Sequence, residues 1–452
     1  MTRSLAQQVP VEVALLGLFE LLLSFLLIHA ALLTPMGREI LAGASPLVSA
    51  DGTVVAAVMT LTMVSTAALI GLYRPRVCLE ADRLVRYLTT AGLCAFPLLL
   101  LVSGALSLGF TMREALGLAS ILIVWLIAIF VSRTAFRLVA GKGWLTRRVL
   151  VLGNGDRAAR LAIRLRTGRG RPFDVSLAAA DAPFPSTASL SEQRIWAVIE
   201  TREESAGTDT NLTGEPENNG IRVFDEARFS EQQLGRLELD LLNAGALRSA
   251  VSRNTTWYAN AATRAFDILG CVLLVVLTLP VMVVTALLVK LDSPGPIFYR
   301  QLRAGLNGRP FMLVKFRSMT VDAEASGAAQ WAQSRDPRIT RVGALIRPLR
   351  IDELPQLLNV LRGEMSLIGP RPERPVFIEQ LAQVIPHYHE RSAVKPGITG
   401  WAQVNFPYGA SVEDAREKLA YDLYYVKYRG VLLDLLILAS TVRVILFRDG
   451  AR

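Results

Sequence analysis

A short tract around residue 350 sets two adjacent carboxylates among arginines, and these residue types suit phosphoryl chemistry. Asp352 and Glu353 are neighbours, Arg347 precedes them, and Arg371 follows between two prolines. The apolar spacing after Glu353 predicts a helix, and Pro355 is tolerated only in the first turn of a helix. The two acids should therefore lie at the helix N-terminus, where an anionic substrate is favoured. The tract also follows a membrane-seeking segment, which predicts a site at a bilayer surface.

The composition places much of the chain in a membrane. Of its 452 residues, 52% are hydrophobic and 19% are charged, and this length suits two or three domains. Four apolar stretches each approach the ~20 residues of a spanning helix, at about 13–33, 53–72, 87–108 and 115–139. We therefore predict a membrane protein of mixed fold with a four-helix transmembrane bundle over residues 1–144. The first stretch is too long for a signal-peptide core, so we expect it to be retained.

Basic residues are concentrated on one side of these four stretches. Arginines separate the second and third stretches and basic residues follow the fourth, whereas the other connections carry mainly Arg38 and Arg113. By the positive-inside rule, both ends of the bundle are cytoplasmic. The net charge of +10 suits contact with anionic lipid or phosphates. Nucleic acid is the rival partner, but no nucleic-acid-binding motif is found and we expect none.

The segment after the bundle opens like a nucleotide-binding domain. An apolar strand over 148–152 precedes a Rossmann-type turn formed by Gly153, Gly155 and Ala158, and we predict a Rossmann-like α/β domain over 145–255. The turn either holds a nucleotide at the helix N-terminus or is a relic in which the glycines only form the turn. We favour the relic, because neither Asp174 nor Asp181 stands where a ribose-binding acid is expected.

A fifth apolar run covers 268–289 and is interrupted by Pro280, which breaks or kinks a straight helix. Arg264 precedes this run, and several basic residues follow it. Both ends therefore prefer the cytoplasmic side. We predict a re-entrant helical hairpin at about 265–290; an ordinary fifth span is the alternative.

From Arg264 onward the chain resembles the bacterial polyprenyl-phosphate sugar-phosphate transferases of the monotopic phosphoglycosyl transferase superfamily. The resemblance rests on motifs that occur in order: Gly295-Pro-Ile-Phe-Tyr-Arg-Gln301, Lys315-Phe-Arg-Ser-Met319, Asp336-Pro-Arg-Ile-Thr-Arg341, Asp352-Glu-Leu-Pro-Gln356, Pro370-Arg-Pro372 and Pro396-Gly-Ile-Thr-Gly-Trp-Ala-Gln403. The preceding spans and Rossmann-like unit are typical of the long members. The ending, with Tyr421-Asp-Leu-Tyr-Tyr425, resembles the subgroup that initiates exopolysaccharide assembly.

The resemblance implies a mainly α catalytic domain over 260–452, anchored by the re-entrant helix. Asp352 would attack the sugar-proximal phosphate of a nucleotide-activated sugar, expected to be a UDP-hexose, and form a covalent phosphosugar. Undecaprenyl phosphate would then accept the sugar phosphate. Glu353 is assigned to a Mg²⁺ ion that bridges the diphosphate, since Mg²⁺ typically takes one or two carboxylates plus substrate phosphates. The residues assigned to bind substrate phosphate or to orient its ligands are Lys315, Arg317, Arg347, Arg371 and Asp422.

The expected location is the bacterial inner membrane, with the catalytic domain facing the cytoplasm, membrane lipid as a partner, and a homo-oligomer as a compatible assembly. One departure from the family pattern is Leu279-Pro280, where small members have Ser-Pro, so a hydroxyl for the freed carbonyls would have to come from Thr278. Two other functions remain open: hydrolysis of the nucleotide-sugar, and a non-catalytic membrane scaffold whose Rossmann-like unit senses a nucleotide.

Overall fold

Five helices of the computed structural model are long and apolar enough to cross a membrane. They cover Val11–Leu32, Gly52–Ile70, Ala81–Ala105, Met112–Val139 and Asn260–Asp292. Four lie where the sequence predicted spans, and the fifth contains the predicted re-entrant segment. The structure describes residues 11–35, 37–38, 52–106, 111–144, 146–153, 155–167, 173–179, 186–201, 221–254, 256–321, 336–406, 409 and 411–447. The chain forms two compact units, Met1–Leu234 and Gly235–Arg452.

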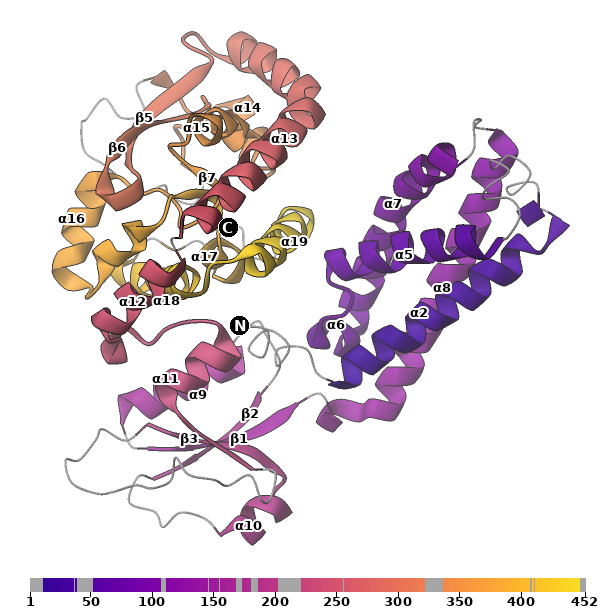
Figure 1. Cartoon of the computed structure of the whole chain (residues 1–452), viewed down its shortest axis with the longest axis horizontal. Coiled ribbons are helices and arrows are strands. Elements are labelled where there is room, and N and C mark those ends of the chain that lie inside the picture. Colours follow the sequence, from indigo (N-terminus) through magenta and orange to yellow (C-terminus); the bar gives the residue numbers. More distant parts are fainter. Residues whose placement is uncertain are drawn as a thin grey trace. The chain divides into compact units, whose positions relative to one another are not determined.

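The first unit begins with long apolar helices that pack side by side. They are α2 (Val11–Leu32), α5 (Gly52–Ile70), α7 (Ala81–Leu106) and α8 (Met112–Trp144), with the short α6 (Pro75–Leu79) between α5 and α7. Helix α2 packs on α5, α5 on α7, α7 on α8 and α8 on α2 (Figure 1). Many of their leucines and isoleucines face outward, including Leu26, Leu93 and Ile127. An apolar outer surface of this kind suits contact with lipid.

A fully buried ion pair joins α2 to α8. Arg133 Nε donates to Glu20 Oε1 at 2.7 Å, and Arg133 Nη2 donates to Glu20 Oε2 at 2.8 Å. Arg133 Nη1 also donates to the carbonyl of Leu72, in the connection that follows α5. One turn along α2, Ser24 accepts a hydrogen bond from the Trp125 indole at 2.8 Å. Because an unpaired charge among apolar helices is costly, this network selects one arrangement of the helices.

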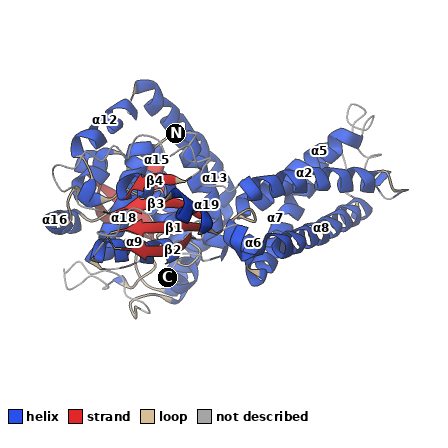
Figure 2. Cartoon of the chain, turned by 90° about the horizontal axis from the view of Figure 1, so that it is seen from below, coloured by secondary structure: helices blue, strands red, loops and turns tan. Residues whose placement is uncertain are grey.

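The rest of the first unit is a small α/β fold around a four-stranded parallel sheet. Its strands are β1 (Arg147–Leu152), β2 (Phe173–Ala178), β3 (Ile195–Glu200) and β4 (Arg222–Asp225), in the order β2-β1-β3-β4 (Figure 2). Helices α9 (Asp156–Thr167), α10 (Thr187–Glu192) and α11 (Glu226–Phe229), with the π-turn Ser230–Leu234, complete the unit. Successive β1 side chains alternate between two clusters, Val149 and Val151 on the α9 side and Leu150 and Leu152 on the other. This alternation explains why β1 is apolar throughout.

The second unit is mainly helical. Its helices are α12 (Ala244–Asn254), α13 (Trp257–Asp292), α14 (Arg341–Ile346), α15 (Leu357–Arg362), α16 (Pro375–Val384), α17 (Trp401–Asn405), α18 (Val412–Tyr428) and α19 (Val431–Phe447). Short 3-10 turns cover Leu239–Leu241, Leu306–Gly308, Ile351–Gln356 (η7) and Tyr388–Ala393 (η8). Two strand pairs complete it: β5 (Phe298–Ala304) antiparallel to β6 (Pro310–Phe316), and β7 (Ser366–Ile368) parallel to β8 (Gly397–Thr399).

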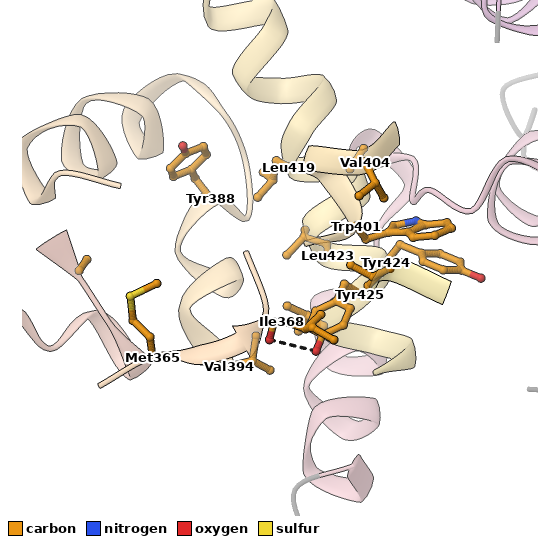
Figure 3. Close-up of a cluster of buried hydrophobic side chains, with 14 of the residues drawn as sticks. Met365, Ile368, Tyr388, Val394, Trp401, Val404, Leu419, Leu423, Tyr424 and Tyr425 are labelled. Carbon is orange, nitrogen blue, oxygen red and sulfur yellow. Dashed lines mark hydrogen bonds between the residues drawn. The ribbon is translucent and has the colours of Figure 1, made fainter. Parts of the chain in front are cut away.

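A large hydrophobic core holds most of these elements together. Trp401 stacks on Tyr424 with ring centroids 6.0 Å apart, and the Tyr425 hydroxyl donates to the carbonyl of Ile368 (Figure 3). Leu237 and Leu247 also belong to this core. The segment Gly235–Asn254 therefore packs with the second unit, upstream of the border at residue 255 predicted from the sequence.

Helix α13 is anchored to the second unit at both of its ends. Near its start, Arg264 donates to the carbonyls of Val360 and Leu361, both at 2.6 Å. Near its end, Val289 packs against Phe316 and against α14. Pro280 lies within the helix, and the ribbon of α13 changes direction along its length (Figure 1).

The Thr278 hydroxyl does not bond to the carbonyl that Pro280 leaves free. Thr278 Oγ1 donates to the carbonyl of Leu274 at 2.7 Å. Pro280 lacks the N–H that would bond to the carbonyl of Val276. Thr278 therefore makes an ordinary bond one turn back along the helix and leaves the carbonyl of Val276 to other partners.

Candidate active site

The acid pair lies in the 3-10 turn η7, which runs directly into α15. The sequence placed both acids at the start of a regular helix, and the difference arises because Pro355 lies within a tighter turn that comes first. Arg350 precedes the turn with a left-handed φ of 58°, a conformation uncommon for residues other than glycine. Asp352 is 8% exposed and Glu353 is 6% exposed. The turn therefore buries two neighbouring carboxylates.

Two arginines hold Glu353. Arg350 Nη1 and Arg371 Nη2 each donate to Glu353 Oε1 at 2.9 Å. Arg371 Nη1 lies 3.5 Å from Glu353 Oε2. Burial alone would raise the pKa of Glu353, but Arg371 and Arg350 outweigh burial and hold this pKa down at about 2. Glu353 is thus a permanent anion at physiological pH.

The pKa of Asp352 is shifted in the opposite direction to that of Glu353. The Oδ1 atom of Asp352 is buried and has no hydrogen-bond partner among the described residues. Burial and the charge of Glu353 raise the pKa of Asp352 to about 6, against the opposing charges of Lys315, Arg371 and Arg347. An ionised carboxylate with an unengaged oxygen can act as a nucleophile. The pair therefore combines one carboxylate held by two arginines with one that keeps an oxygen free of hydrogen bonds among the described residues.

Three of the predicted phosphate-binding cations surround Asp352. Lys315 lies on β6 with Nζ 5.0 Å from the Tyr299 ring centroid, and burial lowers the pKa of Lys315 to about 8. Arg347 ends α14 and is half-buried. Arg371 comes from the segment between β7 and α16. Together they can neutralise phosphate oxygens that approach Asp352.

The other two predicted site residues lie elsewhere. Arg317 donates to the carbonyls of Ser293 at 2.6 Å and Pro294 at 2.8 Å, and so caps the end of α13. Asp422, on α18, forms a 2.7 Å ion pair with Arg391. Arg317 thus stabilises the end of α13. Asp422 is connected to Arg371 through Arg391, which also donates to the carbonyl of Arg371.

Several residues of the site escaped the sequence reasoning. Arg350 lies in the same tract as the acids and could have been found by its spacing from Glu353. Gln403 ends one of the family motifs but was given no role, and Arg391 lies in none of the motifs. Both reach Arg371 only through folding. Gln403 Oε1 accepts from Arg371 Nη1 at 3.4 Å.

The acids fit a magnesium ion that takes most of its ligands from a substrate. Across the described part of the chain, no three His, Cys, Asp or Glu side chains gather as a metal site. Glu353 Oε2 has one long contact, and Asp352 Oδ1 has none. One or two carboxylates are what Mg²⁺ takes when substrate phosphates supply further ligands.

The Rossmann-type turn has a packing explanation. A Cβ atom at Gly153 would lie 1.8 Å from Thr201 Oγ1, so only glycine fits there. Gly155 has a φ of +82°, which favours glycine, and Ala158 is buried in the α9 cluster. Asp174 pairs with Arg148 at 3.2 Å at the start of β2, the end of the sheet away from this turn. Asp181 lies outside the described residues. Nucleotide binding at this turn stays an untested prediction.

Comparison with known proteins identifies the family. Residues 258–448 match the bacterial sugar transferase family. A UDP-glucose:undecaprenyl-phosphate glucose-1-phosphate transferase from Caulobacter vibrioides is 43% identical over 190 residues, which cover 42% of this chain and 71% of that protein. The chain belongs to the bacterial sugar transferase family. The catalytic features described above all lie within the matched region.

Two other relatives are similar to this chain over longer stretches. A UDP-N-acetylgalactosamine-undecaprenyl-phosphate N-acetylgalactosaminephosphotransferase from Aeromonas hydrophila is 46% identical over 232 residues, 51% of this chain and 54% of that protein. An undecaprenyl-phosphate glucose phosphotransferase from Komagataeibacter xylinus is 34% identical over 321 residues, 68% of this chain and 60% of that protein. The alignments with these two relatives thus span little more than half of their lengths.

Proposed function

We propose that the chain transfers a sugar 1-phosphate from a UDP-hexose to undecaprenyl phosphate and thereby starts an exopolysaccharide repeat unit. The observation that carries this proposal is the buried, unengaged Oδ1 of Asp352 beside a carboxylate neutralised by two arginines. The relatives are named as enzymes that act on UDP-sugars or undecaprenyl phosphate, which supports the same substrate classes.

The reaction would proceed in two displacements at phosphorus. Asp352 Oδ1 forms a bond to the sugar-bearing phosphorus, the bond to the bridging oxygen breaks, and the nucleoside monophosphate leaves with that oxygen. A phosphate oxygen of undecaprenyl phosphate then attacks the same phosphorus and releases the Asp352 carboxylate. Lys315, Arg347 and Arg371 stabilise the charge on the phosphate oxygens in both steps. Magnesium held at Glu353 would supply further neutralisation of the diphosphate.

We further propose that α13 is re-entrant and that the second unit faces the cytoplasm of a bacterial inner membrane. Support comes from both ends of α13 contacting the same unit while its apolar side chains between them, such as Leu269, Val276 and Leu287, stay exposed. Trp257 and Tyr258 are exposed at its start, where aromatic residues favour a membrane interface. The α19 surface, with Leu435 and Val442 exposed, would lie at the same interface.

The covalent step can be tested with the full chain in detergent. Incubation with a panel of UDP-sugars and no lipid acceptor should add the mass of a sugar phosphate, and peptide mapping should place the adduct on Asp352. Asp352→Asn should lose both adduct and transfer. Asp434→Asn, which alters a half-buried acid of the same unit, is the matched control and should keep both.

Other outcomes would point to the rival functions. An adduct on another residue would remove Asp352 as the nucleophile. Release of free sugar phosphate in the presence of undecaprenyl phosphate would favour a hydrolase. Normal polysaccharide assembly in cells carrying Asp352→Asn would favour a non-catalytic scaffold.

The topology can be tested by cysteine labelling after the native cysteines are replaced. Tyr258→Cys and Arg309→Cys are exposed positions before and after the apolar part of α13. Neither should react with a membrane-impermeant maleimide added outside spheroplasts, whereas Arg113→Cys, on the predicted periplasmic side, should react. Labelling of position 309 alone would restore an ordinary fifth span.

A further inference from the structure

The backbone segment that carries Arg371 is held at three successive carbonyl groups. The carbonyl of Pro370 accepts from the amide of Gly397 at 2.9 Å. The carbonyl of Arg371 accepts from Arg391 Nη2 at 3.0 Å, and the carbonyl of Pro372 accepts from Arg303 Nη1 at 3.0 Å. A segment with a proline at each end and every carbonyl engaged has little freedom to move. The direction of the Arg371 side chain is therefore set by its surroundings.

The guanidinium of Arg391 connects the Arg371 segment to two other elements. Its Nη2 also pairs with Asp422 Oδ2 at 2.7 Å, and its Nη1 donates to the Tyr388 hydroxyl at 3.2 Å. Arg391 is 7% exposed and Asp422 is 2% exposed. Three elements meet here: the Arg371 segment, the turn η8 with Tyr388 and Arg391, and α18 with Asp422.

A buried ion pair is weak evidence of a gain in stability, because desolvation offsets the attraction between its charges. What the planar guanidinium does provide is fixed geometry, since it can bond to several acceptors in set directions. In this case one of those acceptors is the main chain of Arg371, the residue that holds Glu353.

We propose that Arg391, held by Asp422, is a positioning residue that aims Arg371 at Glu353 and at the phosphates of the nucleotide-sugar. This inference rests on the proposed function. Arg391 itself acts through the backbone of Arg371 and is not assigned a contact with substrate. Asp422, which the resemblance connected only loosely with the site, gains a defined role as the residue that fixes the guanidinium of Arg391.

The chain offers a matched control on the same helix. Glu417 also lies on α18 and pairs with a buried arginine, Arg236, whose other acidic partner among the described residues is Glu238. Asp422→Asn should lower kcat/KM about 10- to 100-fold, the range caused by small misplacements of catalytic groups. Most of this loss should fall on kcat, because Arg371 acts on charge that develops at phosphorus. Glu417→Gln should leave both constants nearly unchanged.

A double-mutant cycle separates positioning from general loosening of the fold. In the Arg371→Lys background, Asp422→Asn should have little further effect, because the group that it positions has already been altered. Glu417→Gln should be additive with Arg371→Lys. Full additivity of Asp422→Asn with Arg371→Lys would overturn the inference.

Two further variants keep the test decisive where Asp422→Asn folds poorly. Arg391→Gln combined with Asp422→Asn removes both charges together and leaves no buried charge unpaired. Tyr388→Phe removes only one acceptor of Arg391. Both should lower kcat, the second less than the first, and unchanged kcat in the folded double variant would refute the positioning role. Absence of turnover by the unaltered chain would refute the proposed function and this inference together, whereas turnover with additive losses would refute this inference alone.

Discussion

Replacement of Asp352 by asparagine should abolish transfer and yet stabilise the second unit at neutral pH. Burial, with the charge of Glu353, raises the pKa of Asp352 from 3.8 to about 6. Because each tenfold change in proton affinity is worth about 1.4 kcal/mol, ionisation of Asp352 costs the fold about 3 kcal/mol. The buried side-chain amide of the asparagine would lack a hydrogen-bond partner, which costs about 1 kcal/mol of folding free energy. We therefore expect Asp352→Asn to raise the free energy of unfolding by about 2 kcal/mol at neutral pH.

The sign and the pH window follow from the direction of each pKa displacement. The folded-state pKa of Asp352 lies above its unfolded value, so its stabilising contribution is complete below pH 3.8 and is lost as the pH rises through about 6. The gain in unfolding free energy of Asp352→Asn over the unaltered protein should thus appear as the pH rises from about 4 to above 6. Glu353 has the opposite sign, because its pKa is held at about 2 rather than 4.5, and its contribution is lost only as the pH falls through about 2. Glu353→Gln should therefore destabilise the unit at neutral pH by about 3 kcal/mol, since it removes the carboxylate charge that Arg371 and Arg350 stabilise in the folded state.

The measurement is urea unfolding of the full chain in detergent micelles, followed by pulse proteolysis with fragments of the second unit as the readout. Unaltered protein, Asp352→Asn and Glu353→Gln are compared from about pH 4 to about pH 8, across the window set by the Asp352 pKa. A less stable Asp352→Asn at neutral pH would refute the electrostatic reasoning. A stability difference that does not change with pH would refute the assignment of the raised pKa.

Four more predictions concern the acid pair, the bundle and the domain border. The transfer rate should fall as the pH drops through about 6, because protonation of Asp352 removes the nucleophile; a rate that is flat down to pH 5 would contradict this, with Asp434→Asn as the control for general effects. Glu353→Gln should weaken the dependence of transfer on magnesium, and an unaltered magnesium titration would remove Glu353 as a ligand. Glu20→Gln should lower the thermal stability of the apolar bundle by several degrees, consistent with about 3 kcal/mol for a broken buried pair. A truncation that begins near residue 235 should transfer sugar phosphate in a membrane. One that begins near residue 260 should lose activity and stability, because it removes leucines from the core. Equal activity of the two truncations would contradict the border seen in the structure.

Local patterns in the sequence were enough to predict much of this protein. The apolar segments are read from composition over about 20 residues, and the structure has a helix at each. The first strand of the α/β fold and the turn after it follow from an apolar run and two glycines. The acid pair was found because its arginines, Pro355 and neighbouring apolar residues stand within a few positions of one another. All these features depend on residues close together in the chain.

The tertiary structure decided which of the charged residues act together. Lys315 and Arg317 are two positions apart, yet one lies at Asp352 while the other caps α13. The reason is that β6 ends at Phe316, so Arg317 is outside the strand and does not share the face of Lys315. Glu20 and Arg133 pair across the bundle, and Arg391 reaches Arg371 through a backbone carbonyl. Such pairings cannot be read from spacing, since the energy of a buried charge depends on the partner and the solvent exclusion that only folding provides. For the same reason, two adjacent carboxylates with nearly equal intrinsic acidity differ in the fold: the pKa of Glu353 is lowered to about 2 and that of Asp352 is raised to about 6.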